Sequence, residues 1–186
     1  RIFDLVLASL TLLIMAPLMA LVALLIKLER RGPVFFSQTR VGQHGSLFTL
    51  HKFRTMEVGS EFKGLYTVEG DPRVTRLGHW LRLTRLDELP QLWNVLRGEM
   101  SLIGPRAEWI KCVERYEQAI PYYHFRHLVR PGITGWAQVN YPYGANIEDT
   151  IEKLMYDLYY IRHFSIALDA TVILKTLHVM LFGKGR

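Results

Sequence analysis

The chain has 186 residues, 49% of them apolar and 12% aromatic, which suits one domain with a buried core plus a membrane segment. Its formal charge of +6 fits anionic lipid headgroups, phosphorylated substrates or nucleic acid as partners. Nucleic acid is disfavoured, because the sequence has neither a known binding motif nor a basic stripe with interleaved aromatic residues. The single cysteine, Cys112, cannot form an intrachain disulfide, which fits a reducing compartment.

The segment 5–26 contains no charged residue and is flanked by charges on both sides. About 20 apolar residues are enough to cross a bilayer core of roughly 30 Å, so this segment is long enough to span a membrane. A signal peptide is excluded, because the apolar part is too long and no small-x-small cleavage site precedes the charged flank. The sequence therefore predicts a protein that works at a membrane.

Pro17 lies near the middle of this apolar segment. Proline removes a backbone donor and clashes with the preceding turn, so it kinks or breaks a helix. Positive charge flanks both ends, Arg1 on one side and Lys27, Arg30 and Arg31 on the other, so charge alone does not choose an orientation. Two topologies stay open: a kinked spanning helix, and a re-entrant helix bent at Ala16-Pro17 that enters and leaves on one face.

The first elements after the membrane segment are β-like. Residues 34–37 and 47–53 form short runs that predict a hairpin joined through Gly42 and Gly45. The polar stretch 57–72 contains glycine and predicts a loop.

The rest of the chain is mainly helical in pattern. A short helix is predicted at 78–86, and a second at 89–96, where apolar residues recur at helical spacing before Gly98. Further helices are predicted around 110–116, before Pro121, and at 147–158. The largely apolar stretch 166–182 predicts a long helix that lies either in the core or flat on the membrane. The predicted fold class is mainly α with a small β-hairpin.

The adjacent carboxylates Asp87 and Glu88 lie in the part of the chain richest in charge. In one interpretation they only cap the following helix, with Asp87 as N-cap and Glu88 beside the helix dipole. In the other they perform chemistry on a phosphate, because four arginines surround them in sequence and arginine binds phosphate oxygens. These arginines are Arg82, Arg85, Arg97 and Arg106. Neighbouring helical side chains diverge by about 100°, so one carboxylate would attack while the other acts as base, metal partner or anchor.

Two further clusters carry polar side chains. Residues 129–140 place Arg130, Trp136 and Gln138 around a Pro- and Gly-fixed turn, although an ordinary loop has the same pattern. Lys52 and Arg54 alternate along the second predicted strand, which puts both cations on one face. The chain has no phosphate-binding P-loop, and the pair His124 and His127 lacks the further ligands that a metal site needs.

Several motifs in a fixed order make the whole chain resemble the bacterial sugar transferases, the monotopic polyprenyl-phosphate phosphoglycosyl transferases. They are RIFD at 1–4, the Pro17-broken apolar segment, FSQTRVG at 36–42, KFRTM at 52–56, LDELPQL at 86–92, GPR at 104–106 and RPGITGWAQV at 130–139. The resemblance implies a re-entrant membrane helix over 1–31 and a cytosolic catalytic domain over 32–186, at the cytoplasmic face of the bacterial inner membrane. It also implies transfer of a sugar 1-phosphate from a UDP-sugar to polyprenyl (undecaprenyl) phosphate with Mg²⁺ and release of UMP, as the first membrane step of exopolysaccharide assembly.

The resemblance assigns roles to individual residues. Asp87 would be the nucleophile that forms a phosphosugar–aspartyl intermediate in a ping-pong cycle, and it would share Mg²⁺ with the diphosphate. Glu88 completes the catalytic pair. The phosphate-binding candidates are Arg82, Arg106 and Arg130, followed by Lys52, Arg54 and Gln138.

The chain departs from the family pattern at two positions. Ala16 stands where many members have serine before the proline, and Ala107 stands where proline is frequent after the arginine. A start at Arg1 without methionine fits the catalytic domain of a larger member, and the helix at 166–182 leaves a homodimer open. The alternative function is a non-catalytic membrane protein that binds nucleotides or lipid headgroups.

Overall fold

The computed structural model describes residues 1–60, 70–142, 144 and 146–182. The described part is mainly helical with two small sheets, as the residue pattern predicts. Most of the predicted loop at 57–72 lies outside the described residues.

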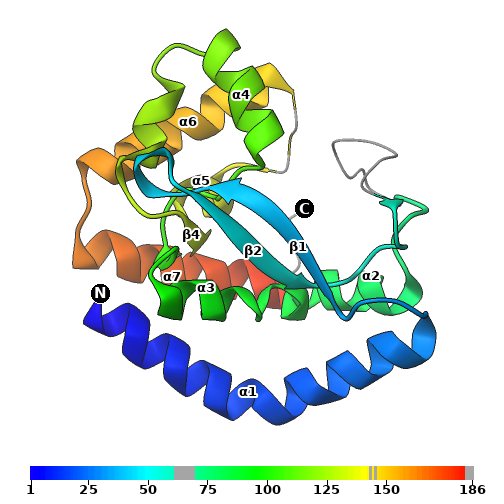
Figure 1. The fold of residues 1–186 in the computed structure, drawn as a ribbon. Helices are drawn as coiled ribbons and strands as arrows, with labels where there is room; N and C mark the ends of the chain where they lie inside the picture. Colours follow the sequence, from blue (N-terminus) through cyan, green and yellow to red (C-terminus); the bar gives the residue numbers. More distant parts are fainter. Residues whose placement is uncertain (61–69, 143, 145, 183–186) are drawn as a thin grey trace.

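Helix α1 (Ile2–Glu29) is the longest element, and it is long and apolar enough to cross a membrane. Figure 1 shows it along one side of the molecule with a bend near its middle. The helix runs through Ala16 and Pro17 without interruption, so the described chain has one continuous helix where a break was predicted. A few side chains, among them Ala8 and Val22, are buried against the domain, while most of the large apolar ones are exposed.

The N-terminal end of α1 is tied to the folded domain by polar contacts. The buried Asp4 carboxylate accepts hydrogen bonds from Ser101 Oγ at 3.0 Å and from the Leu102 amide at 3.1 Å. The Arg1 guanidinium donates to the Val95 carbonyl oxygen at 2.7 Å. This end therefore docks on β3 (Ser101–Ile103) and on α3 (Gln91–Arg97).

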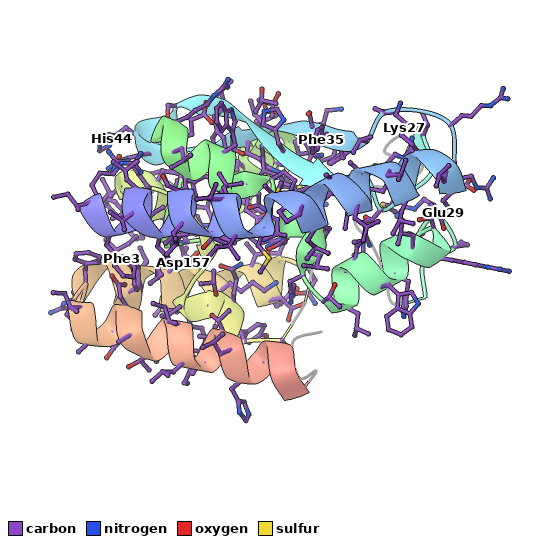
Figure 2. The ribbon with its side chains drawn as sticks, turned by 90° about the horizontal axis from the view of Figure 1, so that it is seen from below. Phe3, Lys27, Glu29, Phe35, His44 and Asp157 are labelled. Atoms are coloured by element: carbon purple, nitrogen blue, oxygen red, sulfur yellow. The ribbon has the colours of Figure 1, made fainter. Side chains whose placement is uncertain are left out.

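The C-terminal end of α1 is tied to the same domain. Arg54 is 7% exposed and donates to the carbonyl oxygens of Arg30 at 2.8 Å and Arg31 at 3.2 Å, just beyond the helix. Glu29 accepts a hydrogen bond from the Leu77 amide at 2.9 Å. Figure 2 views the molecule from the side on which α1 lies, with Phe3 near one end of this helix and Lys27 and Glu29 near the other. Both ends of the apolar helix thus contact one domain.

The predicted hairpin is confirmed. Strands β1 (Phe35–Val41) and β2 (Leu47–Phe53) pair antiparallel from Phe35 opposite Phe53 to Val41 opposite Leu47. A turn of 3₁₀ helix, η1 (Gln43–Gly45), joins them and places Gly45 at φ 77°, in the left-handed region that suits glycine.

A second sheet was not predicted from the sequence. β3 pairs in parallel with β4 (Gly132–Thr134), and each strand has only three residues. A Cβ on Gly104 would lie 2.4 Å from the Arg130 carbonyl oxygen, so the two segments approach too closely for any larger residue. This pairing brings the GPR and RPGITG motifs together.

The predicted helices are confirmed with shifted ends. The described helices after the hairpin are α2 (Arg76–Leu83), α3 (Gln91–Arg97), α4 (Ile110–Ala119), α5 (Trp136–Asn140), α6 (Ile147–Arg162) and α7 (Ile166–Phe182), with 3₁₀ turns η3 (Leu86–Glu88) and η4 (Tyr123–Leu128). The helix predicted at 78–86 ends at Leu83, because Arg85 adopts φ 59°. The helix predicted from Leu89 begins at Gln91 and ends, as predicted, at Gly98.

One of the hydrophobic clusters of the core forms where the hairpin, α3 and α1 meet, with Leu50, Leu92 and Val95 among its buried residues. Helix α7 is partly in the core, as predicted: Val172 is fully buried, whereas Leu174 and Leu177 are exposed. Its predicted contact with the membrane stays a prediction. Figure 1 shows α1, α3 and α7 in the lower half of the molecule and α4 and α6 in the upper half.

Candidate active site

Asp87 and Glu88 lie in the 3₁₀ turn η3, between α2 and α3. Arg85 precedes the turn in the left-handed conformation and reverses the chain, so both carboxylates point inward, with exposed fractions of 7% and 9%. The N-cap of α3 is Pro90, and no side chain caps this helix. The interpretation of Asp87 as a helix N-cap is therefore wrong.

Glu88 is held in an ion pair with Lys52 of β2. Lys52 Nζ donates to Glu88 Oε1 at 2.8 Å, and Arg106 Nη1 lies 3.7 Å from the same oxygen. Burial opposes ionisation of Glu88, but the charges of Lys52 and Arg106 outweigh it and lower the pKa of Glu88 to about 2. Glu88 is thus a permanent negative charge that fixes two cations.

Asp87 has a different environment. Burial raises the pKa of Asp87 above its ordinary value, and the nearby charges of Lys52 and Arg82 only partly offset this. Within the described part of the chain, the Asp87 carboxylate accepts no hydrogen bond. A desolvated carboxylate without a fixed partner, beside several cations, is suited to attack an electrophilic phosphorus.

Arg106 reaches this site because the two glycine-rich motifs fix its backbone. Gly132 N donates to the Pro105 carbonyl oxygen at 2.9 Å, and Arg106 forms an isolated parallel bridge with Gly132. A Cβ on Gly132 would lie 2.1 Å from Gly104 N, so only glycine permits this approach. The predicted rigid turn at Gly104-Pro105-Arg106 therefore presents a guanidinium to Glu88.

The other predicted binding residues fall in different places. Arg82 Nε donates to Thr55 Oγ1 at 2.9 Å, and its charge acts on Asp87. Arg130 is half-buried in the turn that leads into β4. Gln138 Nε2 donates to the Ile133 carbonyl oxygen at 3.0 Å, away from the two carboxylates in sequence and in its contacts.

Arg54 does not join Lys52, although the two alternate along the chain. Lys52 pairs with Glu88, whereas Arg54 binds the backbone carbonyl groups at the end of α1. Arg54 therefore has a part in holding α1, and its predicted contact with substrate stays a prediction.

Two residues at the site were not singled out from the sequence. Arg40 of β1 and Gln91 at the start of α3 line a small cavity together with Lys52 and Arg106. Both lie inside motifs that the sequence does reveal, FSQTRVG and LDELPQL, but nothing in the spacing showed that these motifs meet.

The two carboxylates fit a magnesium ion only if substrate phosphates and water supply the remaining ligands. The described residues contain no group of three or more His, Cys, Asp or Glu that could hold a metal. Mg²⁺ is commonly bound by one or two carboxylates together with substrate phosphates and water. Because Glu88 is paired with Lys52, Asp87 is the carboxylate that fits this mode.

Comparison with known proteins gives a consistent family. A family described as bacterial sugar transferase matches residues 1–183. The chain is 48% identical over 183 residues to a UDP-N-acetylgalactosamine-undecaprenyl-phosphate N-acetylgalactosaminephosphotransferase of Aeromonas hydrophila, covering 98% of this chain and 43% of that protein. It is 46% identical over 178 residues to a UDP-glucose:undecaprenyl-phosphate glucose-1-phosphate transferase of Escherichia coli K12, covering 93% of this chain and 38% of that protein.

A third relative is similar in length to the chain. The exopolysaccharide production protein PSS of Rhizobium leguminosarum is 43% identical over 193 residues, covering 100% of this chain and 96% of that protein. The chain therefore spans less than half of the first two relatives and nearly all of the third.

Proposed function

Because the chain belongs to the bacterial sugar transferase family, we propose that it transfers a sugar 1-phosphate from a UDP-sugar to undecaprenyl phosphate, giving the lipid diphosphate sugar and UMP. The observation that carries the proposal is the pair of buried carboxylates with unequal environments. Glu88 is bound to Lys52, whereas Asp87 has no such partner among the residues that the structure describes and lies among cations. Transfer of a phosphosugar needs one nucleophile and fixed positive charge, and this arrangement supplies both.

The reaction proceeds in two displacements. In the first, an Asp87 oxygen attacks the β-phosphorus of the UDP-sugar, forming an O–P bond while the bond from that phosphorus to the bridging oxygen breaks. UMP leaves with the bridging oxygen, and the sugar phosphate remains on Asp87. In the second, a phosphate oxygen of undecaprenyl phosphate attacks the same phosphorus, and the Asp87 carboxylate is released.

Lys52 and Arg106 stabilise the charge that develops on the phosphate oxygens, because both are fixed by Glu88 before substrate binds. Glu88 itself acts as an anchor, since its pKa of about 2 keeps it ionised and unable to donate a proton near neutral pH. Mg²⁺, bound between Asp87 and the diphosphate, would supply further charge neutralisation.

The way α1 is attached supports a re-entrant topology. A helix that spans a bilayer separates its two ends by the full membrane, yet here Asp4 at one end and Glu29 at the other both bind the same domain. The exposed apolar side chains of α1, among them Leu13, Ile14 and Leu24, would then face lipid. On this proposal the site lies at the cytoplasmic face of the inner membrane, beside the headgroups where the lipid phosphate is found.

Cysteine labelling tests the topology. Phe3→Cys and Leu28→Cys place thiols at exposed positions near the two ends of α1, while the native Cys112 is buried. A membrane-impermeant maleimide should label both positions in inverted vesicles and neither in right-side-out vesicles. Labelling of the two positions from opposite sides would establish a spanning helix and contradict the proposal.

A nucleotide-release assay tests the reaction. The purified chain in detergent is supplied with undecaprenyl phosphate, Mg²⁺ and a panel of UDP-sugars that includes UDP-glucose and UDP-N-acetylgalactosamine, the donors named for its relatives. We expect lipid-dependent UMP release with one donor, abolished in Asp87→Asn. Tight binding of UDP-sugar without UMP release, and unchanged in Asp87→Asn, would favour the non-catalytic binding protein.

A further inference from the structure

A small cavity lies beside Glu88, between the hairpin and the start of α3. Its volume is on the order of 10 Å³, the space of about one oxygen atom or water molecule. It is lined by Arg40, Leu50, Lys52, Gln91, Met100, Arg106, Ala107 and Gly132. The cavity thus joins five motifs of the sequence, those at 36–42, 52–56, 86–92, 104–106 and 130–139.

Two buried hydrogen-bond donors at this cavity have no partner. Gln91 is 3% exposed, and its amide nitrogen Nε2 forms no hydrogen bond with any of the described residues. Arg40 Nε is also buried and unpaired, although Arg40 Nη1 donates to the Ala107 carbonyl oxygen at 2.9 Å. Buried polar groups are nearly always paired, so two unpaired donors at one cavity indicate a missing acceptor.

The charges around the cavity indicate that this acceptor is an anion. Arg40, Lys52 and Arg106 contribute three positive charges, and Glu88 pairs with Lys52 at 2.8 Å and with Arg106 at 3.7 Å. The second nearby acid, Glu108, lies 3.9 Å from Arg40, a weaker pairing than that of Glu88 with Lys52. Three cations thus face two carboxylates, which leaves an excess of positive charge at the cavity. A phosphate oxygen matches the charge, the N–H donors and the size of the space, whereas a sugar or a base is too large.

We propose that Gln91 and Arg40 bind a phosphate oxygen of the substrate, and that with Lys52 and Arg106 they form the anion site beside Glu88. The proposal rests on the transferase function for the identity of the phosphate. The same site chemistry fits the diphosphate of the UDP-sugar and the phosphate of the lipid, and kinetic measurements with each substrate separate these sources.

The first test replaces one donor and keeps the shape. Gln91→Met removes the amide at similar side-chain length, and Gln118→Met makes the same change at an exposed site on α4 as the matched control. Hydrogen bonds to charged groups are strong enough that we expect kcat/KM to fall roughly 10- to 100-fold in Gln91→Met and to stay unchanged in Gln118→Met. A fall seen when the UDP-sugar is varied identifies the diphosphate, and a fall seen only when undecaprenyl phosphate is varied identifies the lipid phosphate. Equal kcat/KM for both substrates in wild type and Gln91→Met would overturn the proposal and leave the cavity to a bound water.

A second variant covers the case in which Gln91→Met does not fold. Arg40→Lys keeps the positive charge but removes Nε, and Arg115→Lys is its exposed control on α4. We expect kcat/KM to be lower in Arg40→Lys than in the wild type and in Arg115→Lys, while the melting temperatures of the two variants stay close to each other. Unchanged kcat/KM in a folded Arg40→Lys would contradict the assignment.

The third test is independent of turnover and uses inorganic pyrophosphate as the probe. Pyrophosphate should raise the melting temperature of the wild-type chain and of Gln118→Met, and should fail to do so in Gln91→Met. If no UDP-sugar is turned over, the proposed function fails, but the pyrophosphate result still decides the anion site. An equal rise in Gln91→Met and Gln118→Met would refute it.

Discussion

The ion pair between Glu88 and Lys52 makes the stability of this protein depend on pH in a defined way. The two side chains are 10% and 16% exposed, and their charged atoms lie 2.8 Å apart. The pKa of Glu88 is lowered from 4.5 to about 2 in the folded chain. At about 1.36 kcal/mol per pKa unit, the ionised carboxylate stabilises the folded state by about 3 kcal/mol at pH 7.

The direction of the pH effect follows from the lowered pKa. Because Glu88 is more acidic in the folded chain than in the unfolded chain, its contribution is fully present above pH 4.5 and is lost as the pH falls toward 2. By pH 3 about 2 of the 3 kcal/mol should be gone. Glu88→Gln carries no charge at any pH, so the difference between wild type and variant should shrink by that amount between pH 7 and pH 3.

Chemical denaturation of both proteins in the same detergent at the two pH values measures this difference. Glu117→Gln, at an exposed position on α4, is the matched control and should track the wild type at both pH values. A difference between wild type and Glu88→Gln that stays the same at pH 7 and pH 3 would refute the pairing on which the site is built.

Three further predictions concern the core, the nucleophile and the attachment of α1. The buried Arg126 guanidinium pairs with Asp157 at 2.8 Å, and Asp157→Asn removes this counter-charge. The variant should therefore lower the free energy of unfolding by about 3–5 kcal/mol. A loss below about 1 kcal/mol would show that the pair is dispensable. Burial raises the pKa of Asp87 above 3.8, and the nucleophile must be ionised to attack. In a pH–rate profile, kcat/KM should therefore fall with decreasing pH, with a midpoint above 3.8. A midpoint at or below 3.8 would contradict the assignment of Asp87 as nucleophile. Asp4→Ala removes the acceptor for Ser101 Oγ and the Leu102 amide and should cost about 1–3 kcal/mol, read as a lower denaturation midpoint; an unchanged midpoint would mean that this contact does not hold α1.

Much of the fold is visible in the sequence because its elements are long or strongly periodic. The apolar segment of α1, the second hairpin strand at Leu47–Phe53 and the amphipathic helices each repeat a pattern over several residues. The first strand was predicted only at 34–37, whereas it extends over Phe35–Val41. Three-residue strands carry no such pattern, so the parallel pairing of β3 with β4 could not be predicted. The glycines at 104 and 132 were visible as turn residues, but their mutual approach depends on tertiary contact.

The sequence predicts the residues of the site that lie in recognisable motifs, but not the contacts that these residues form in the fold. Asp87 and Glu88 were candidates from their arginine-rich surroundings, yet their different roles appear only when Lys52 reaches Glu88 across the fold. Arg54 looked equivalent to Lys52 because the two alternate on a strand, but tertiary structure directs Arg54 to the end of α1. Gln91 carried no signal of its own, since an unpaired buried amide is recognisable only from its surroundings.

The measurement that tests the central claim most directly is the capture of the sugar phosphate on the protein. The chain is mixed with its UDP-sugar and Mg²⁺ in the absence of undecaprenyl phosphate, quenched, and analysed by intact mass and by peptide mapping. The account predicts an adduct with the mass of one sugar phosphate on the peptide that contains Asp87, lost on addition of the lipid phosphate and absent in Asp87→Asn. Steady lipid-dependent UMP release without any adduct, or an adduct on another residue, would contradict it.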